Sequence, residues 1–489
     1  MNNIIVFIFL VPLITFCISL IFISSLKFQK IISLIMSGVY LGFTLELINR
    51  VLTNGSLSLA SGGWLAPYGI TLTVDILSAT MLLATGIVYF AGMIYSEPGK
   101  TCEDSPYYFP LLNMLFVGIS GAFIAADLFN LYVWFEITLL SSFVLMGLRS
   151  TKQRLGGNLK YIVLNLISSL LFLLGVGLVY SATGELSFSE LIVELSAIQK
   201  VNPEYLLAMN LILFCAFAIK SGLFPFYQWL GASYPQVSPA LSGIFAGMLT
   251  KVGLYAIFRV NGLLFPVDQY FVLIVAIIPA LTMVTGVIKA IGQNQMRRIL
   301  SFHIVSQVGY IAVASFALTS PDMETKKLAL IAGFFYAVHH IIVKANLFFV
   351  AGIVKYSYGS DDINEVSHVR HSSPLLAILF AIPALSLVGI PPSSGFWAKL
   401  SLFQLILPLE NYFIIACMLI AGFFTLFSMI KIWIGVFWGD GTEIPVRKNE
   451  LPKYPLMACG FLCLISLVLA FAPEVLLSII KMGIERLAL

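Results

Sequence analysis

Five charged side chains stand in the middle of long apolar stretches of this 489-residue chain. They are Glu136 in LYVWFEITLL, Lys220 in LFCAFAIKSGLF, Lys251 in FAGMLTKVGLYAIF, Lys344 in HHIIVKANLFFV and Lys399 in SGFWAKLSLF. A charged group at bilayer depth costs about 2.5–3.5 kcal/mol even on insertion scales, so such groups usually face a bundle interior or a wet cavity. Five of them in one chain predict a route for ions or protons.

The side chains of Glu136 and Lys220 can both take up and release a proton. A lysine beside a carboxylate keeps its proton, whereas a desolvated lysine without a partner tends to lose it. We therefore expect that closing and opening a Glu136–Lys220 pair makes the lysine alternately hold and release a proton. The alternative for Glu136 is a structural carboxylate, bonded by the nearby hydroxyls of Thr138, Ser141 and Ser142.

Further basic groups extend this route. Lys251 lies well inside an apolar run and is expected to continue it; the alternative is a lysine that snorkels to the interface. Lys344 and His340 are four residues apart, hence on one face of a helix, and an imidazole titrates near neutrality, which suits a proton relay. His339 is the weaker candidate on a neighbouring face, and for His303 a relay role and a structural role are equally open.

Three other charged residues lie near or inside apolar runs and carry different predictions. Lys289 is expected to snorkel toward the loop that holds Arg297 and Arg298. Asp75 is expected to orient a helix close to the outer surface, and the role of Lys431 is left open.

The composition is that of a polytopic membrane protein. Hydrophobic residues make up 60% of the chain and charged residues 10%, with a mean hydropathy of +0.99. A membrane span needs about 20 mostly apolar residues. This rule predicts an all-α membrane-embedded unit with about 14 spans: 4–25, 31–52, 72–96, 110–126, 128–149, 161–182, 206–229, 239–260, 269–292, 303–319, 328–354, 374–407 (interrupted), 411–438 and 455–478.

The basic residues are placed unevenly along these spans. The loops after odd-numbered spans hold 14 of the 27 lysines and arginines, the opposite side holds seven, and the rest lie within spans. By the positive-inside rule, both termini are expected on the outer face of a bacterial cell (inner) membrane. The first apolar stretch lacks a basic leader and a cleavage site, so it is interpreted as a span and not as a signal peptide.

Two stretches break the helical pattern at bilayer depth. Prolines and glycines interrupt span 7 over residues 220–239 and span 12 over residues 388–400, and proline removes a helix hydrogen bond. Interrupted helices in corresponding places of two halves indicate an inverted-repeat transporter. We predict two inverted five-helix repeats with discontinuous helices 7 and 12, and the divisions are: 1–109 (flanking helices 1–3), 110–260 (first repeat), 269–438 (second repeat) and 455–489 (flanking helix 14).

The sequence contains no motif for several classes of chemistry. We find no Walker A loop, no dinucleotide fingerprint and no metal-ligand spacing. The six cysteines form no CxxC pair, and the basic residues form no nucleic-acid patch. The expectation is a transporter subunit and not an enzyme, without cofactor or metal, driven by an ion gradient or by a partner subunit.

The same buried residues lie in motifs that closely resemble the antiporter-like subunits shared by complex I, membrane-bound hydrogenases and Mrp-type cation/proton antiporters. The resemblance covers nearly the whole chain, and residues 62–79 and 151–175 are similar to the D-type subunit of Mrp antiporters. The motifs are LFNLYVWFEI, AIKSGLFPFYQWL, MLTKVGLY, RRILSFHIVSQVGY, HHIIVKANLFFVAG and GIPPSSGFWAKL.

This resemblance implies a proton-translocating subunit that works with other subunits of an Mrp complex, in contact with membrane lipid, and exchanges protons for sodium or another monovalent cation. Carried over by position, Glu136 and Lys220 form the gating ion pair. Lys251 and Lys344 form the central relay with His340, and Lys399 lies on the exit side. Two alternatives stay open: a proton-pumping membrane subunit of a redox complex, and a non-conducting scaffold.

Overall fold

The computed structural model describes residues 3–64, 68–148, 152–439 and 449–486, and of residues 152–154 only the backbone. Five of the 14 basic residues counted in the loops after odd-numbered spans are therefore not fully described. Arg149, Arg447 and Lys448 lie outside the described residues, and so do the side chains of Lys152 and Arg154. So do parts of the two stretches that resemble the D-type subunit.

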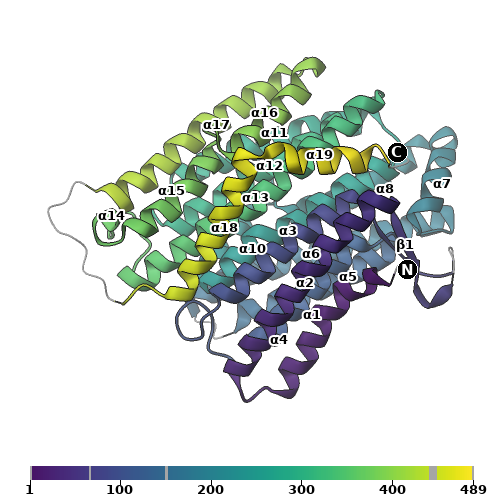
Figure 1. The fold of residues 1–489 in the computed structure, drawn as a ribbon. Coiled ribbons are helices and arrows are strands. Elements are labelled where there is room, and N and C mark those ends of the chain that lie inside the picture. Colours follow the sequence, from purple (N-terminus) through teal and green to yellow (C-terminus); the bar gives the residue numbers. More distant parts are fainter. Residues whose placement is uncertain (1–2, 65–67, 149–151, 440–448, 487–489) are drawn as a thin grey trace.

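The described residues form a bundle of membrane-spanning helices (Figure 1). Twelve helices are long and apolar enough to cross a membrane, and the shorter α4 (Tyr108–Ile124) and α15 (Pro374–Val388) bring the total to the predicted 14. The all-α polytopic fold is thus confirmed. The twelve are α1 (Ile4–Ile21), α2 (Leu26–Asn54), α3 (Ile76–Tyr95), α5 (Leu128–Gly147), α6 (Lys152–Thr183), α8 (Pro203–Ser221), α10 (Pro239–Ala256), α11 (Gln269–Ile291), α12 (Met296–Ala317), α13 (Met323–Tyr358), α17 (Tyr412–Ile432) and α18 (Lys453–Phe471).

Some short elements were not predicted. The predicted span 455–478 is wrong at its end, because α18 stops at Phe471 and Pro473, which cannot continue a helix, begins a separate one. The predicted span 72–96 begins in a strand. The additional elements are β1 (Leu57–Ala60), β2 (Thr71–Val74), α7 (Phe188–Val201), α14 (Val369–Ser372) and α19 (Pro473–Ile484).

Both ends of the chain lie at one end of the bundle, together with α7 and β1, while α14 lies at the opposite end (Figure 1). This arrangement requires an even number of spans, as predicted. We call the end with α14 the predicted inner face and the end with the termini the predicted outer face.

Spans 7 and 12 are broken as the sequence predicts. Helix α8 ends at Gly222 and α15 at Gly389, both in the left-handed backbone region, with φ of 73° and 86°. Glycine adopts this conformation without the clash that a Cβ would cause. In each case a proline follows three residues later, Pro225 and Pro392. The spans resume as α9 (Gln228–Ser233) and α16 (Ser394–Ile406).

Spans 8 and 13 share a second irregularity. Helix α10 runs on into the π-helix Ile257–Leu264, and α17 runs on into the π-helix Trp433–Trp438. Such segments are rare and frequently lie at functional sites. Spans 8 and 13 would be counterparts in the inverted repeat, which stays a prediction.

The centre of the bundle is formed by α10 and α13, whose apolar windows are fully buried. Small residues bring the two helices together. A Cβ added at Gly243 would lie 2.3 Å from the Phe349 ring, and one at Gly352 would lie 2.3 Å from Pro239. The two helices that carry Lys251 and Lys344 are therefore in close contact.

A buried ion pair holds the predicted inner face together. Arg297, at the start of α12, donates from Nε to Asp361 Oδ2 at 3.0 Å, and Lys355 Nζ lies 3.5 Å from Asp361 Oδ1. Burial raises the pKa of the Asp361 carboxyl, but the positive charges of Arg297 and Lys355 lower it by more, so its pKa lies below the ordinary value.

We expect Asp361→Ala to lower the free energy of unfolding by about 3–5 kcal/mol, as when one partner of a buried ion pair is removed. The measurement is thermal denaturation of the purified complex in detergent, with Glu365→Ala, an exposed neighbour, as the control. Because the folded pKa is depressed, the stabilisation is complete above the unfolded value of about 4 and is lost as the pH falls through the folded value. A difference between variant and native protein that persists undiminished in strong acid would contradict this account.

Candidate functional site: a buried row of protonatable groups

Glu136 on α5 and Lys220 on α8 lie near each other but are not in direct contact. Lys220 is 4% exposed, and its Nζ lies 5.4 Å from the ring centroid of Phe135, the residue before Glu136. The carboxylate is close enough to act electrostatically on the amine. In the described part of the chain, neither Glu136 Oε1 nor Lys220 Nζ has a hydrogen-bond partner. The structure therefore places the predicted partners Glu136 and Lys220 near each other without a direct ion pair between them.

The broken end of α8 explains how Lys220 is tolerated at this depth. Lys220 lies in the last turn of α8, two residues before the cap at Gly222. The carbonyl end of a helix carries a partial negative charge that favours a cation. The helix break thus places Lys220 at a helix end that favours a cation.

Lys251 follows on the neighbouring helix α10 and is fully buried. Its Nζ donates to Ala246 O at 2.6 Å. Helices α8 and α10 approach closely, because a Cβ at Gly253 would lie 2.4 Å from Ser221 Oγ. Lys220 and Lys251 each lie one or two residues from this contact, so they lie at a similar level on adjacent helices.

His340 and Lys344 lie opposite Lys251 across the α10–α13 contact. Both are fully buried. Lys251 and Lys344 are each within electrostatic range of His340, and of one another. Lys344 Nζ donates to Leu300 O at 3.3 Å, whereas neither ring nitrogen of His340 has a partner among the described residues. These three groups form one cluster; the spacing predicted that His340 and Lys344 share a face of one helix, and the family resemblance added Lys251.

His303 on α12 links this cluster to the second helix break. It is fully buried, and Lys344 and Lys399 both act on it electrostatically. Within the described ranges both of its ring nitrogens lack a partner. The position between two lysines favours the relay role over the structural role, since a structural histidine would normally be hydrogen-bonded.

Lys399 on α16 ends the row at the side of the bundle. Its Nζ donates at 2.6 Å to Val388 O, a carbonyl that the end of α15 leaves without a helix partner. The amine lies 5.2 Å from the ring centroid of Tyr310. The side chain is half-buried and borders a mostly apolar cavity of about 330 Å³. We call Glu136, Lys220, Lys251, His340, Lys344, His303 and Lys399 the buried row.

Sequence reasoning missed a polar network beside the row. Tyr336 donates to Gln307 Oε1 at 2.6 Å, and its ring stacks on Tyr310 with centroids 5.7 Å apart. The signal was present, since His303, Gln307 and Tyr310 are spaced at i, i+4 and i+7 and share a face of α12. His339 stays outside the row: its Nδ1 lies 2.9 Å from Ser394 Oγ.

Two charged residues outside the row have structural roles. Lys431, whose role the sequence left open, donates to Ile291 O and Gln293 O and so caps the end of α11. Asp75 accepts from Ser78 N at 3.0 Å, which caps the start of α3, and it also pairs with Arg259. The expectation that Asp75 orients a helix is met.

Comparison with known proteins shows the family of this chain. Residues 125–425 match the family described as NADH:quinone oxidoreductase/Mrp antiporter, TM. The chain is 38% identical over 482 residues to the D-type subunit of the Na(+)/H(+) antiporter of Alkalihalophilus pseudofirmus, covering 97% of this chain and 95% of the relative. The chain belongs to this family.

Further known proteins are also similar to this chain. It is 33% identical to the D-type subunit of the Na(+)/H(+) antiporter of Bacillus subtilis, over 97% of this chain and 95% of the relative. A chain in the Mrp complex from Dietzia sp. DQ12-45-1b superposes with a TM-score of 0.90 at 27% identity, covering 99% and 97% of the two chains. A chain of an archaeal membrane-bound sulfane sulfur reductase shares the fold alone, with a TM-score of 0.89 at 24% identity.

We expect Lys399→Glu to move the pH profile of transport in this Mrp-type protein toward acid. A carboxyl group releases its proton at a far lower pH in water than an ammonium group, and an ionised carboxylate cannot donate to Val388 O. The measurement is the initial transport rate across a pH series in vesicles, with Lys399→Arg, which keeps the donor, as the control. An unchanged profile would show that Lys399 is structural.

Proposed function

We propose that this chain is the proton-translocating subunit of a multisubunit Mrp-type antiporter that exchanges protons for sodium across a bacterial cell membrane. The observation that carries the proposal is the buried row, which crosses the bundle from α5 to α16. Its members are carboxylate, amine and imidazole groups, all of which hold and release protons. Buried ionisable groups inside a membrane typically mark such relays.

The spacing within the row suggests how a proton advances. Lys251 and Lys344 act on one another and on His340. Like charges in a shared desolvated site disfavour each other, so a proton that arrives at one group promotes release from the next. Closing the Glu136–Lys220 pair would favour the charged lysine, and opening it would send the proton on toward Lys251.

The choice of sodium rests on the relatives, whose names describe Na(+)/H(+) antiporters. Other subunits of the same complex are the proposed partners, with membrane lipid around the apolar outer helices. In this proposal both termini face the outer side, and the chain itself catalyses no covalent reaction.

The test uses everted vesicles from an antiporter-deficient host that expresses the whole complex. Addition of sodium should restore acridine-orange fluorescence in vesicles with native protein. Glu136→Gln keeps the shape of the side chain but removes its charge, so we expect the sodium response to disappear. Glu190→Gln, on the exposed side of α7, is the control and should respond like the native complex.

Each other outcome has a defined meaning when the amounts of assembled complex are matched. A sodium response that survives Glu136→Gln would place the proton path outside the row. No response to any monovalent cation in the native complex would favour a redox-driven pump. Co-purifying flavin or iron–sulfur proteins would then identify that alternative.

A further inference from the structure

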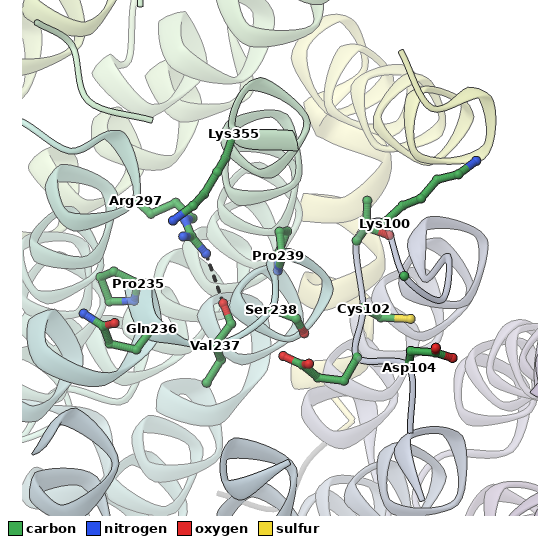
Figure 2. A pocket seen from close by; sticks show the side chains of 13 residues that line it. Lys100, Cys102, Asp104, Pro235, Gln236, Val237, Ser238, Pro239, Arg297 and Lys355 are labelled. Atoms are coloured by element: carbon green, nitrogen blue, oxygen red, sulfur yellow. Dashed lines mark hydrogen bonds between the residues drawn. The ribbon is translucent and has the colours of Figure 1, made fainter. Parts of the chain in front are cut away.

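The two ends of α10, the helix that carries Lys251, differ in their surroundings. At the predicted inner face its first residue, Pro239, lines a pocket of about 490 Å³ (Figure 2). At the other end α10 runs on into the π-helix Ile257–Leu264, which carries Arg259, a cation outside the row. Arg259 is eight residues beyond Lys251, or about 12 Å further along the axis at about 1.5 Å per residue.

Arg259 lies at the outer boundary of the bundle. Its partner Asp75 directly follows β2, which pairs with β1 at the predicted outer face (Figure 1). Exposure falls from this boundary inward along α10, because the side chain of Arg259 is 16% exposed, Tyr255 is 4% exposed and Lys251 is fully buried. Arg259 and Tyr255 therefore lie between the outer solution and Lys251.

The guanidinium of Arg259 is held by three partners. Its Nη2 donates to Asp75 Oδ1 and, at 3.3 Å, to Ser78 Oγ. Its Nε donates to Tyr255 OH at 3.0 Å. The Asp75 carboxylate compensates the positive charge, which would be costly to bury alone. A guanidinium is not deprotonated in proteins, so an immobile Arg259 cannot pass a proton inward.

The hydroxyl of Tyr255 is fixed as well. It donates to Phe123 O at 2.8 Å, a backbone carbonyl near the end of α4. A hydroxyl has a single proton to donate, and this one is engaged with a carbonyl that carries it no further. The amine of Lys251 is directed away from Tyr255, since it donates to Ala246 O, five residues nearer the inner end of α10. The hydrogen bonds of the described residues thus do not connect Lys251 with Tyr255.

Aromatic side chains form an apolar layer around Tyr255. Its ring packs edge-on against Phe123, with centroids 5.0 Å apart, and against Phe334 on α13 at 6.1 Å. The Phe258 ring lies 5.6 Å from that of Phe334, and a Cβ added at Gly333 would lie 3.3 Å from Phe258. The four aromatic residues are at most 4% exposed. Such an apolar layer offers a water molecule too few polar partners to bind.

We propose that Arg259, fixed by Asp75 and Tyr255, is a proton barrier that separates Lys251 from the outer solution. The proposal rests on the proposed function, because a barrier matters only if protons move along the row. It goes beyond that function, since it assigns a task to a charged group outside the row. A proton that entered directly at Lys251 would bypass the first part of the row and would cross without exchange for sodium. An arginine is one of the means by which membrane pores exclude protons.

The test measures proton leak in the absence of sodium. Everted vesicles from the antiporter-deficient host are acidified by respiration in choline buffer without sodium or potassium. After respiration is stopped, the recovery of acridine-orange fluorescence gives the leak rate, and co-purification gives the amount of assembled complex. The variants are Arg259→Gln, Asp75→Asn, and Arg259→Gln combined with Lys251→Met. Vesicles without the complex give the background rate, and Arg50→Gln, which breaks an exposed arginine–glutamate pair near the outer end of α2, is the matched control.

We expect Arg259→Gln to raise the leak rate by at least about tenfold over the native complex, which is less than the cost of a charge at bilayer depth allows. The substitution opens space beside Asp75 and frees the Tyr255 hydroxyl, so water reaches Lys251. Asp75→Asn breaks the same ion pair but keeps the guanidinium, so its leak should equal that of the native complex, as should that of Arg50→Gln. Adding Lys251→Met to Arg259→Gln should return the leak to the native rate, because the entering proton then has no acceptor in the row.

An unchanged leak in Arg259→Gln would overturn the proposal. Equal leaks in Arg259→Gln and Asp75→Asn would also overturn it, since the ion pair would then be purely structural, and so would a leak that persists after Lys251→Met. If Arg259→Gln does not assemble, its combination with Asp75→Asn repeats the measurement without an unpaired carboxylate, and an unchanged leak there would be equally decisive. A native complex without any sodium response would instead count against the proposed function, while the leak would still decide whether Arg259 is a barrier.

Discussion

Lys220→Ala should lower sodium-dependent proton movement by at least about 10²-fold, the lower end of what a positioned proton carrier contributes. The substitution removes the amine at the end of α8 and leaves the Glu136 carboxylate without a cation to exchange with. The readout is acridine-orange dequenching in everted vesicles, with the amount of assembled complex measured by co-purification. Lys220→Met should give the same result, because it keeps apolar volume and removes only the charge.

The matched control for this change is Lys289→Met. Lys289 is a cation near the same helix break, with its Nζ 4.9 Å from the ring centroid of Tyr227, but it lies outside the row. The complex with Lys289→Met should transport normally. Normal antiport in Lys220→Ala itself would remove the relay hypothesis.

Lys344→Met is expected to lower transport to a similar degree, by about 10²-fold, because it interrupts the row at its centre. The substitution takes one of the two amines from the cluster around His340 and leaves Leu300 O without its donor. The measurement is the same dequenching assay, and Lys326→Met, near the other end of α13, is the control. If Lys344→Met kept its transport while Lys220→Ala lost it, protons would have to leave the row before the α10–α13 contact.

The sequence alone predicts the spans, and it predicts which charged residues lie inside them, well. Apolar runs of about 20 residues locate the 14 spans, and a charged residue inside such a run is visible without a structure. The breaks at Gly222 and Gly389 are also predictable, since each glycine is followed by a proline that cannot continue a helix. Composition and local spacing determine these features.

Features that depend on distances between helices could not be predicted. The open Glu136–Lys220 pair is one example, because the sequence does not say how far α5 lies from α8. Helices α7 and α19 were missed, since short amphipathic helices at a surface resemble loops or the continuation of a span. The pocket at the predicted inner face is lined by the α3–α4 loop and by Arg297 of α12, and nothing in the sequence connects these segments.

The helix break at Gly389 has an electrical consequence for the whole row. Helix α15 ends at bilayer depth with its carbonyls directed at Lys399, and the end of a helix carries roughly half a negative elementary charge. Lys220 lies in the last turn of α8, at a helix end of the same kind. The peptide groups of the break at Gly389 are therefore an immobile counter-ion to Lys399, and unlike carboxylates they cannot be neutralised by protons. A row with four lysines and one glutamate can in this way carry positive charge through a membrane interior without further acidic residues.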